Sequence, residues 1–205
     1  MDKIGILDYG MGNVGSIRNM LKHVSQCEIM NVRDPEDMER IDKMILPGVG
    51  AFDAGMELLE SKGMVEEICD FAVIQKKPIL GICLGMQLLG NGSEEGTRKG
   101  LGLLDFDVVR FQTDGRKIPH MGWNYVQIEK KIPLFQGIEV EENRYYFVHS
   151  YHALCKEKEL SAMTCEYGYR FTAAVAKGNI YGVQFHPEKS HAYGMKIMKN
   201  FAEVC

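Results

Sequence analysis

The sequence predicts a single α/β domain with a mixed, mostly parallel β-sheet and helices on both faces. Strand-like and helix-like segments alternate through the first half, which is typical of parallel strands joined by helices. The 205 residues exceed a common domain length only modestly, so we expect one domain over residues 1–205. Hydrophobic residues make up 45% and charged residues 25%, values that exclude disordered, coiled-coil and collagen-like chains.

The first half is expected to hold four strands, each followed by a turn and a helix. Pro35 suits the first turn of a short helix, because that position has no intrahelical N–H bond to lose. The run Pro47-Gly48-Val49-Gly50 ends the third strand. Strands are expected at 3–7, 27–31, 43–46 and 78–82, and helices at 16–24, after 34, at 52–75 with a break at Gly63, and at 83–89.

The second half changes character, because short strand-like segments follow one another with only turns between them. This pattern favours antiparallel or mixed pairing. No repeat or polar linker separates the halves, so we expect them to share one core. The expected strands are 107–111, 125–129, 145–149, 160–165, 171–177 and 180–185, and a final helix spans 194–204.

Charge and cysteine content narrow the function. A net charge of −4 argues against binding to nucleic acid or anionic membranes, which requires an excess of Lys and Arg. The N-terminus shows no secretory signal, and no apolar run is long enough to span a bilayer. The six cysteines form no Cys-x-x-Cys pair. We therefore expect a cytoplasmic protein with reduced thiols.

The segment Gly81-Ile82-Cys83-Leu84-Gly85-Met86-Gln87 carries the strongest chemical signal. A strand enters a helix through a turn with glycine two residues before and two after a cysteine, which is the arrangement of a nucleophile elbow with sulfur in place of a hydroxyl. A helix N-terminus favours the thiolate over the thiol. Cys83 is therefore a candidate nucleophile, and the alternative is a small buried cysteine at a tight junction.

The segment Val183-Gln184-Phe185-His186-Pro187-Glu188 offers a base for that nucleophile. His186 and Glu188 flank a proline at the end of an apolar strand, so their side chains leave on the same side of the chain. The carboxylate can hold one imidazole nitrogen while the other faces a thiol. A lone histidine here would more often be structural, but the nearby carboxylate and the elbow cysteine favour a catalytic role.

Together these motifs resemble those of the class I, or triad, glutamine amidotransferases. The likeness also includes Pro47-Gly48-Val49-Gly50-Ala51-Phe52, Pro119-His120-Met121-Gly122-Trp123-Asn124 and Tyr146-Phe147-Val148-His149-Ser150-Tyr151, and it runs from Gly5 to the final helix. It implies a flavodoxin-like fold without metal or cofactor. The implied reaction is hydrolysis of glutamine to glutamate and ammonia by a triad of Cys83, His186 and Glu188.

The resemblance also implies roles around the triad. The backbone amides of Leu84 and of the Val49 and Gly50 segment would hold the oxyanion, in a loop whose peptide can turn over. The glutamine pocket would be lined by Gly48, Gln87, His149, Ser150 and Tyr151.

Within the family the chain is most similar to subunits that pass ammonia to a separate (β/α)₈-barrel cyclase of histidine biosynthesis, in a heterodimer. Asn13, Trp123, Tyr146 and Lys189 match positions near that junction. A related subunit that serves a sugar or surface-glycan pathway remains an alternative, because Val14-Gly15-Ser16-Ile17 and His191-Ala192-Tyr193-Gly194 depart from the expected pattern.

Other kinds of site stay open at this point. The turn Gly10-Met11-Gly12-Asn13-Val14-Gly15 fits the dinucleotide-binding Gly-x-Gly-x-x-Gly pattern, with Asp34 near the ribose-contacting distance. His149, His152 and Cys155 can be drawn as zinc ligands, although a strand does not present all three on one face. A general cysteine hydrolase would share the Cys and His chemistry but leaves the Trp123 and Val49 segments unexplained.

Overall fold

A computed structural model describes residues 2–112, 115–138 and 143–205 of the protein. The strands are β1 (Lys3–Leu7), β2 (Glu28–Val32), β3 (Lys43–Gly48), β4 (Ile79–Cys83), β5 (Phe106–Arg110), β6 (His120–Ile128), β7 (Arg144–His149), β8 (Tyr151–Cys155), β9 (Ser161–Tyr167), β10 (Tyr169–Lys177) and β11 (Ile180–Val183). The α-helices are α1 (Val14–Val24), α2 (Phe52–Ser61), α3 (Met64–Cys69), α4 (Leu84–Leu88) and α5 (His191–Glu203). Shorter helical turns are η1 (Pro35–Arg40), η2 (Asp70–Ile74), η3 (Pro133–Phe135), η4 (Lys158–Leu160) and η5 (Pro187–Lys189).

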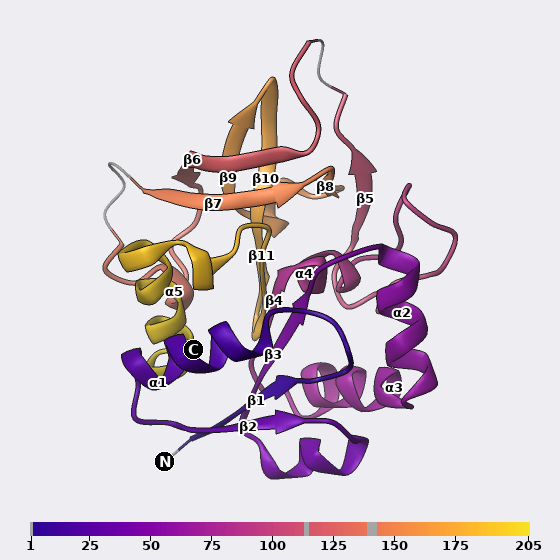
Figure 1. The fold of residues 1–205 in the computed structure, drawn as a ribbon, viewed down its shortest axis with the longest axis vertical. Helices are drawn as coiled ribbons and strands as arrows, with labels where there is room; N and C mark the ends of the chain where they lie inside the picture. The colour runs from indigo at the N-terminus through magenta and orange to yellow at the C-terminus, as the bar shows by residue number, and fades with distance from the viewer. Residues whose placement is uncertain (1, 113–114, 139–142) are drawn as a thin grey trace.

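The described strands form one sheet in the order β2-β1-β3-β4-β11-β10-β9-β6-β7, with β8 paired to β10 and β5 paired to β8 (Figure 1). The predicted α/β fold with a mixed sheet is confirmed. Its parallel part is smaller than expected: among the described strands, four pairings are parallel and six are antiparallel. The later strands are joined by turns rather than helices, and such short connections favour antiparallel pairing.

Helices cover both faces of the parallel strands, as predicted. In β3, Ile45 packs into the core beneath α1 and α5, whereas Met44 and Leu46 pack into the core beneath α2 and α3. Figure 1 shows these two pairs of helices on opposite sides of β1, β3 and β4. Successive strand residues point to opposite faces, so one apolar strand supplies both cores. Within the described segments, no helix has the length and apolar character needed to cross a membrane.

Most of the expected elements agree with the structure, and the differences lie in the second half. The break at Gly63 separates α2 from α3, and Gly63 adopts φ +66° there. Strand β6 starts at His120 rather than near 125. Gly122 lies within the strand with φ +126°, a backbone conformation that residues other than glycine rarely adopt. Strand β8 was not predicted, since only Ser150 separates it from β7. Helix α5 starts at His191, three residues before the expected 194.

The topology brings three separate segments to one edge of the sheet. Strands β3, β4 and β11 are parallel neighbours, with Gly48 opposite Cys83 and Val183 opposite Ile82. Their carboxyl ends therefore lie side by side, which is where open α/β sheets bind ligands. The candidate nucleophile and the His186 segment meet at this edge.

Candidate active site

Cys83 occupies a strained turn between β4 and α4, with φ 55° and ψ −111°. A residue with a side chain rarely adopts such a positive φ, and strain of this kind concentrates at functional sites. The flanking glycines are required by space. A Cβ on Gly85 would stand 1.8 Å from the carbonyl oxygen of Leu46, and one on Gly81 would stand 2.6 Å from the carbonyl oxygen of Gly85. The turn is therefore a nucleophile elbow that tolerates only glycine beside the cysteine.

His186 and Glu188 form a buried pair beside that cysteine. The Nδ1 atom of His186 lies 2.9 Å from Oε1 of Glu188, and the side chains are 2% and 1% exposed. Burial alone would lower the pKa of His186, but the proximity of Cys83 and Glu188 outweighs the effect of burial and raises this pKa to about 9. The other ring nitrogen, Nε2, is also buried, and no hydrogen-bond partner for it lies among the described residues. It is available to take a proton from the thiol.

The cysteine and histidine open into a pocket of about 380 Å³. Its wall includes the elbow, the loop after β3 and the turn between β7 and β8. Glu95 supplies a carboxylate to this wall and also accepts a hydrogen bond from the Phe52 amide at 2.8 Å. The lining residues are Val49, Gly50, Cys83, Leu84, Gln87, Glu95, Pro119, Val148, His149, Ser150, Tyr151 and His186. Of the residues predicted for oxyanion and substrate binding, only Gly48 is outside this lining. Gly48 is the last residue of β3 and pairs with Cys83 of β4.

The loop after β3 rests on the turn after β1. The Tyr9 hydroxyl donates to the Pro47 carbonyl at 2.8 Å, and burial, with Cys83 nearby, raises the pKa of Tyr9 so that this hydroxyl stays protonated. A Cβ on Gly12 would stand 2.7 Å from the Cβ of Pro47, and Gly50 adopts φ +111°. Glycine therefore permits both the close contact and the backbone turn of the expected oxyanion loop.

A chain of hydrogen bonds supports the wall formed by residues 149–151. His149 donates from Nδ1 to the Tyr151 carbonyl at 2.8 Å. Its Nε2 must then accept from Nδ1 of His120 at 3.0 Å, and Nε2 of His120 lies 3.2 Å from the amide nitrogen of Asn124. Burial lowers the pKa of His120 to about 4 and that of His149 to about 3. Both rings are therefore neutral near pH 7.

The residues expected at a partner junction lie outside the pocket. Trp123 is 43% exposed on β6, is edge-on to Tyr146 at 6.3 Å and stacks on His191 at 5.5 Å. The Lys189 amine lies 5.7 Å from the Tyr146 ring centre. Asn13 has a structural role as well, since its side chain accepts from the Ser16 amide and caps α1.

The two binding-site alternatives gain no support from the geometry. In a dinucleotide site the third glycine allows close packing of helix on strand, yet a Cβ on Gly15 would have no heavy atom within 4 Å. Asp34 instead precedes η1 as its N-cap residue. Among the described residues, no group of three or more His, Cys, Asp or Glu side chains is arranged to hold a metal ion.

Four residues at or beside the site were not singled out by sequence: Tyr9, Glu95, His120 and Gln184. Gln184 carried the clearest signal, since a polar residue within an apolar strand end must find buried partners. His120 belongs to segment 119–124, which carries part of the family resemblance, but nothing in the sequence indicates which residue it contacts. Glu95 lies in a long connection without periodicity, and no local pattern marks it.

The family profile and the similar proteins agree on one family. The profile described as glutamine amidotransferase class-I matches residues 5–205. A protein of Pseudomonas aeruginosa named imidazole glycerol phosphate synthase subunit HisH 2 is 50% identical over 98% of this chain and 99% of its own length. A protein of Methanococcus maripaludis with the same name is 52% identical over 97% and 98%.

Solved structures share the fold. The structure described as PurLQS from Thermotoga maritima has a TM-score of 0.77 at 20% identity and covers 98% of each chain. A putative GMP synthase protein from Thermoplasma acidophilum has a TM-score of 0.73 at 21% identity, over 98% of this chain and 92% of that chain. At such low identity the likeness concerns the fold alone.

Proposed function

Because this chain belongs to the class I glutamine amidotransferase family, we propose that it is the glutaminase subunit of an imidazole glycerol phosphate synthase. It hydrolyses L-glutamine to L-glutamate and ammonia for histidine biosynthesis. The observation that carries this proposal is that the elbow thiol of Cys83 and the imidazole of His186 line one pocket, and that His186 is held by the buried carboxylate of Glu188. The relatives' names favour the histidine pathway over a sugar or surface-glycan pathway.

The reaction follows from the placement of three side chains. Nε2 of His186 takes the proton of Cys83, and the sulfur attacks the side-chain carbonyl carbon of glutamine. Glu188 holds Nδ1 and stabilises the imidazolium that forms. His186 then protonates the departing ammonia and leaves a thioester. In the second half, His186 activates a water molecule that releases glutamate.

The oxyanion of each tetrahedral intermediate needs donors fixed in advance. Leu84 begins α4, so its amide N–H is free of an intrahelical partner. A second amide would come from the Val49 and Gly50 loop, whose glycine allows the peptide to turn. Glutamine itself carries an ammonium and a carboxylate, and Glu95 supplies a carboxylate for the ammonium. Polar groups of Gln87, His149, Ser150 and Tyr151, with the backbone near Gly48, complete the expected substrate wall.

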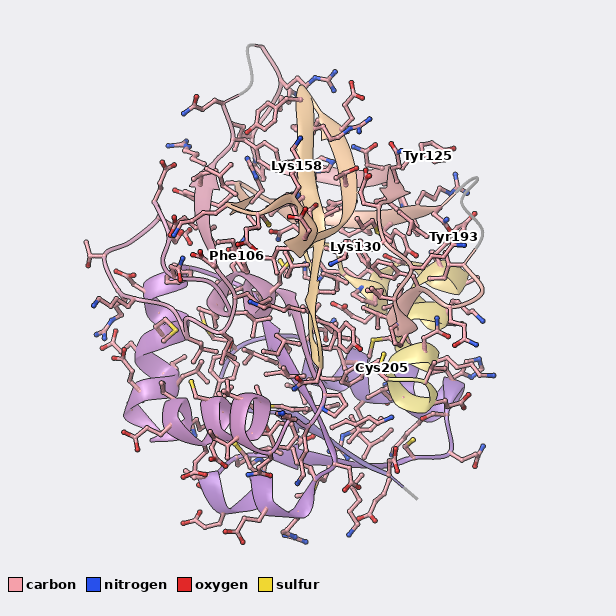
Figure 2. All side chains as sticks on the ribbon, turned by 180° about the vertical axis from the view of Figure 1, so that it is seen from behind. Phe106, Tyr125, Lys130, Lys158, Tyr193 and Cys205 are labelled. Carbon is pink, nitrogen blue, oxygen red and sulfur yellow. The ribbon has the colours of Figure 1, made fainter. Side chains whose placement is uncertain are left out.

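The partner is a cyclase, for which we propose a (β/α)₈ barrel in a heterodimer. Three large apolar side chains on β6 are exposed: Met121 at 61%, Trp123 at 43% and Tyr125 at 60%. Tyr125 lies at the margin of the molecule beside the antiparallel strands (Figure 2). Exposed apolar clusters of this kind mark protein interfaces. Tyr146, Lys189 and Asn13 would line the same junction and the ammonia entrance.

Two further assignments complete the proposal. Residues 1–205 form one glutamine amidotransferase domain, since both cores share the same strands of one sheet. We expect it to act in the cytoplasm without metal or cofactor.

The proposal is tested by glutamate release from L-glutamine in the presence of the cyclase and its ligand. Wild-type protein should release glutamate, and Cys83→Ala should abolish release while leaving partner binding intact. Normal release by the folded variant would overturn the assignment. Purification of the native complex and mass spectrometry of the companion chain test the partner. Recovery of an enzyme of sugar metabolism in place of a cyclase would redirect the pathway.

A further inference from the structure

Gln184 is a fully buried amide next to the nucleophile that the reaction above does not use. It follows β11, and its side chain lies at 0% exposure. Its backbone amide donates to the Ala173 carbonyl at 2.9 Å, so the side-chain amide is not needed for that sheet pairing. Burying an amide without hydrogen bonds costs free energy, so a buried amide is expected to have partners. Those partners indicate its role.

The Gln184 side chain bridges two other side chains. Its Oε1 accepts from Nε2 of Gln87 at 3.0 Å. Its Nε2 donates to Sγ of Cys83 at 3.7 Å, a normal length for a hydrogen bond to sulfur. The amide thus connects the helix that follows the nucleophile to the nucleophile itself.

The direction of this bridge is fixed by a backbone carbonyl. The Tyr151 oxygen can only accept, and it receives hydrogen bonds from His149 at 2.8 Å and from Nε2 of Gln87 at 3.1 Å. Gln87 must therefore present its NH₂ group, and that group also faces Gln184. Gln184 then has to offer its oxygen to Gln87, which leaves its own NH₂ group facing Cys83.

We propose that Gln184 is a further residue of the catalytic site, whose side-chain N–H stabilises the Cys83 thiolate. A thiolate accepts hydrogen bonds far better than a thiol, so a fixed donor favours the charged form. The thiol proton goes to Nε2 of His186, and no other atom changes hands in this step. When the sulfur forms its bond to the substrate carbon, negative charge moves to the substrate oxygen and the Gln184 contact weakens.

This inference deepens the proposed glutaminase but is measured without glutamine. Alkylation by iodoacetamide requires the thiolate, and peptide mass spectrometry separates Cys83 from the other cysteines. We would follow its rate against pH in the full chain for wild type, Gln184→Leu and Gln184→Glu. Gln26→Leu, at an exposed glutamine in the loop after α1, serves as the matched control.

In Gln184→Leu, the midpoint of the alkylation profile should rise by about one pH unit, because one hydrogen bond to a charged group is lost. The rate at pH values below the midpoint should fall about tenfold, and the limiting rate at high pH should be retained. Gln184→Glu should move the midpoint further, since a carboxylate then faces the sulfur. Gln26→Leu should match wild type.

An unchanged midpoint in folded Gln184→Leu would overturn the proposal. Should that variant not fold, Gln184→Glu keeps the size and shape of the side chain. An upward midpoint there supports the contact between this side chain and the sulfur that the proposal requires, and an unchanged midpoint refutes it. A shifted midpoint in a protein that releases no glutamate would refute the glutaminase assignment and leave this inference standing.

Discussion

The neutral pair of His149, in the pocket wall, and His120, behind it, makes folding stability depend on pH. Burial, first of all, lowers the pKa of His149 to about 3 and that of His120 to about 4, from an ordinary value of 6.5. Between about pH 6.5 and pH 4 the unfolded chain therefore binds protons that the folded chain does not. Stability contributed by these groups is complete above pH 6.5 and decreases as the pH falls.

The size of this decrease follows from linkage. Each such group contributes about 1.4 kcal/mol per pH unit inside the window. The unfolded histidines are only half protonated at pH 6.5, so the two together should cost roughly 3 kcal/mol between about pH 6.5 and pH 5. That is a large share of a typical unfolding free energy of about 5–15 kcal/mol. The lowered pKa of His152, again from burial first, acts in the same direction.

His186 does not obscure the measurement. Its folded pKa is raised to about 9, so its contribution to stability is complete below pH 6.5 and lost as the pH rises toward 9. It is constant across the acidic window. Most carboxylates titrate below about pH 5, which sets the lower limit of the experiment.

The assay is urea unfolding of wild type and His120→Phe at several pH values between about 5 and 7. His120 stacks between Phe147 at 4.9 Å and Tyr167 at 4.1 Å, so phenylalanine preserves the ring stack while removing one titrating group. The pH slope of the variant should be shallower, by a difference that approaches about 1.4 kcal/mol per pH unit at the acidic end of this range. A wild-type stability that stays constant or rises on acidification would refute the reasoning, as would a full slope in the variant.

Three further substitutions test the surroundings of the nucleophile. Gly85→Ala places a Cβ 1.8 Å from the Leu46 carbonyl oxygen and should destabilise by about 3 kcal/mol or more in urea unfolding; wild-type stability would contradict the steric account. Tyr9→Phe leaves the buried Pro47 carbonyl without its 2.8 Å donor and should cost about 1–3 kcal/mol, so an unchanged unfolding midpoint would count against that contact. Glu188→Gln keeps a partner for the imidazole but removes its charge, and kcat for glutamate release should fall by a factor of about 10²–10⁴ with little change in KM; an unaltered kcat would exclude the carboxylate from the mechanism.

The elbow was predictable from sequence because all of its determinants are local. Glycines at positions 81 and 85 lie within two residues of Cys83, and the backbone geometry that they permit needs no distant partner to recognise. His186 and Glu188 are likewise adjacent in sequence. Their meeting with Cys83 depends on the pairing of β4 with β11. That pairing was not predicted from the sequence, and only the family resemblance joined the three residues into a triad.

The supporting contacts depend on register and could not be predicted. His120 and His149 meet because β6 and β7 pair with these two residues directly opposite each other. The predicted strand began near residue 125, after Gly122, whereas β6 begins at His120. His120 was therefore not placed in a strand, and this pairing could not be predicted. Gln184 finds Gln87 only because α4 packs against β11. Such contacts join residues about 30 to 100 positions apart, where periodicity carries no information.

Capture of the glutamine side chain by the sulfur of Cys83 can be measured directly. A diazo-ketone analogue of glutamine, incubated with the protein in complex with its cyclase, should alkylate Cys83 alone and abolish glutamate release in proportion to labelling. Peptide mass spectrometry identifies the modified residue. An adduct on another residue, or full loss of activity with Cys83 unmodified, would contradict the account.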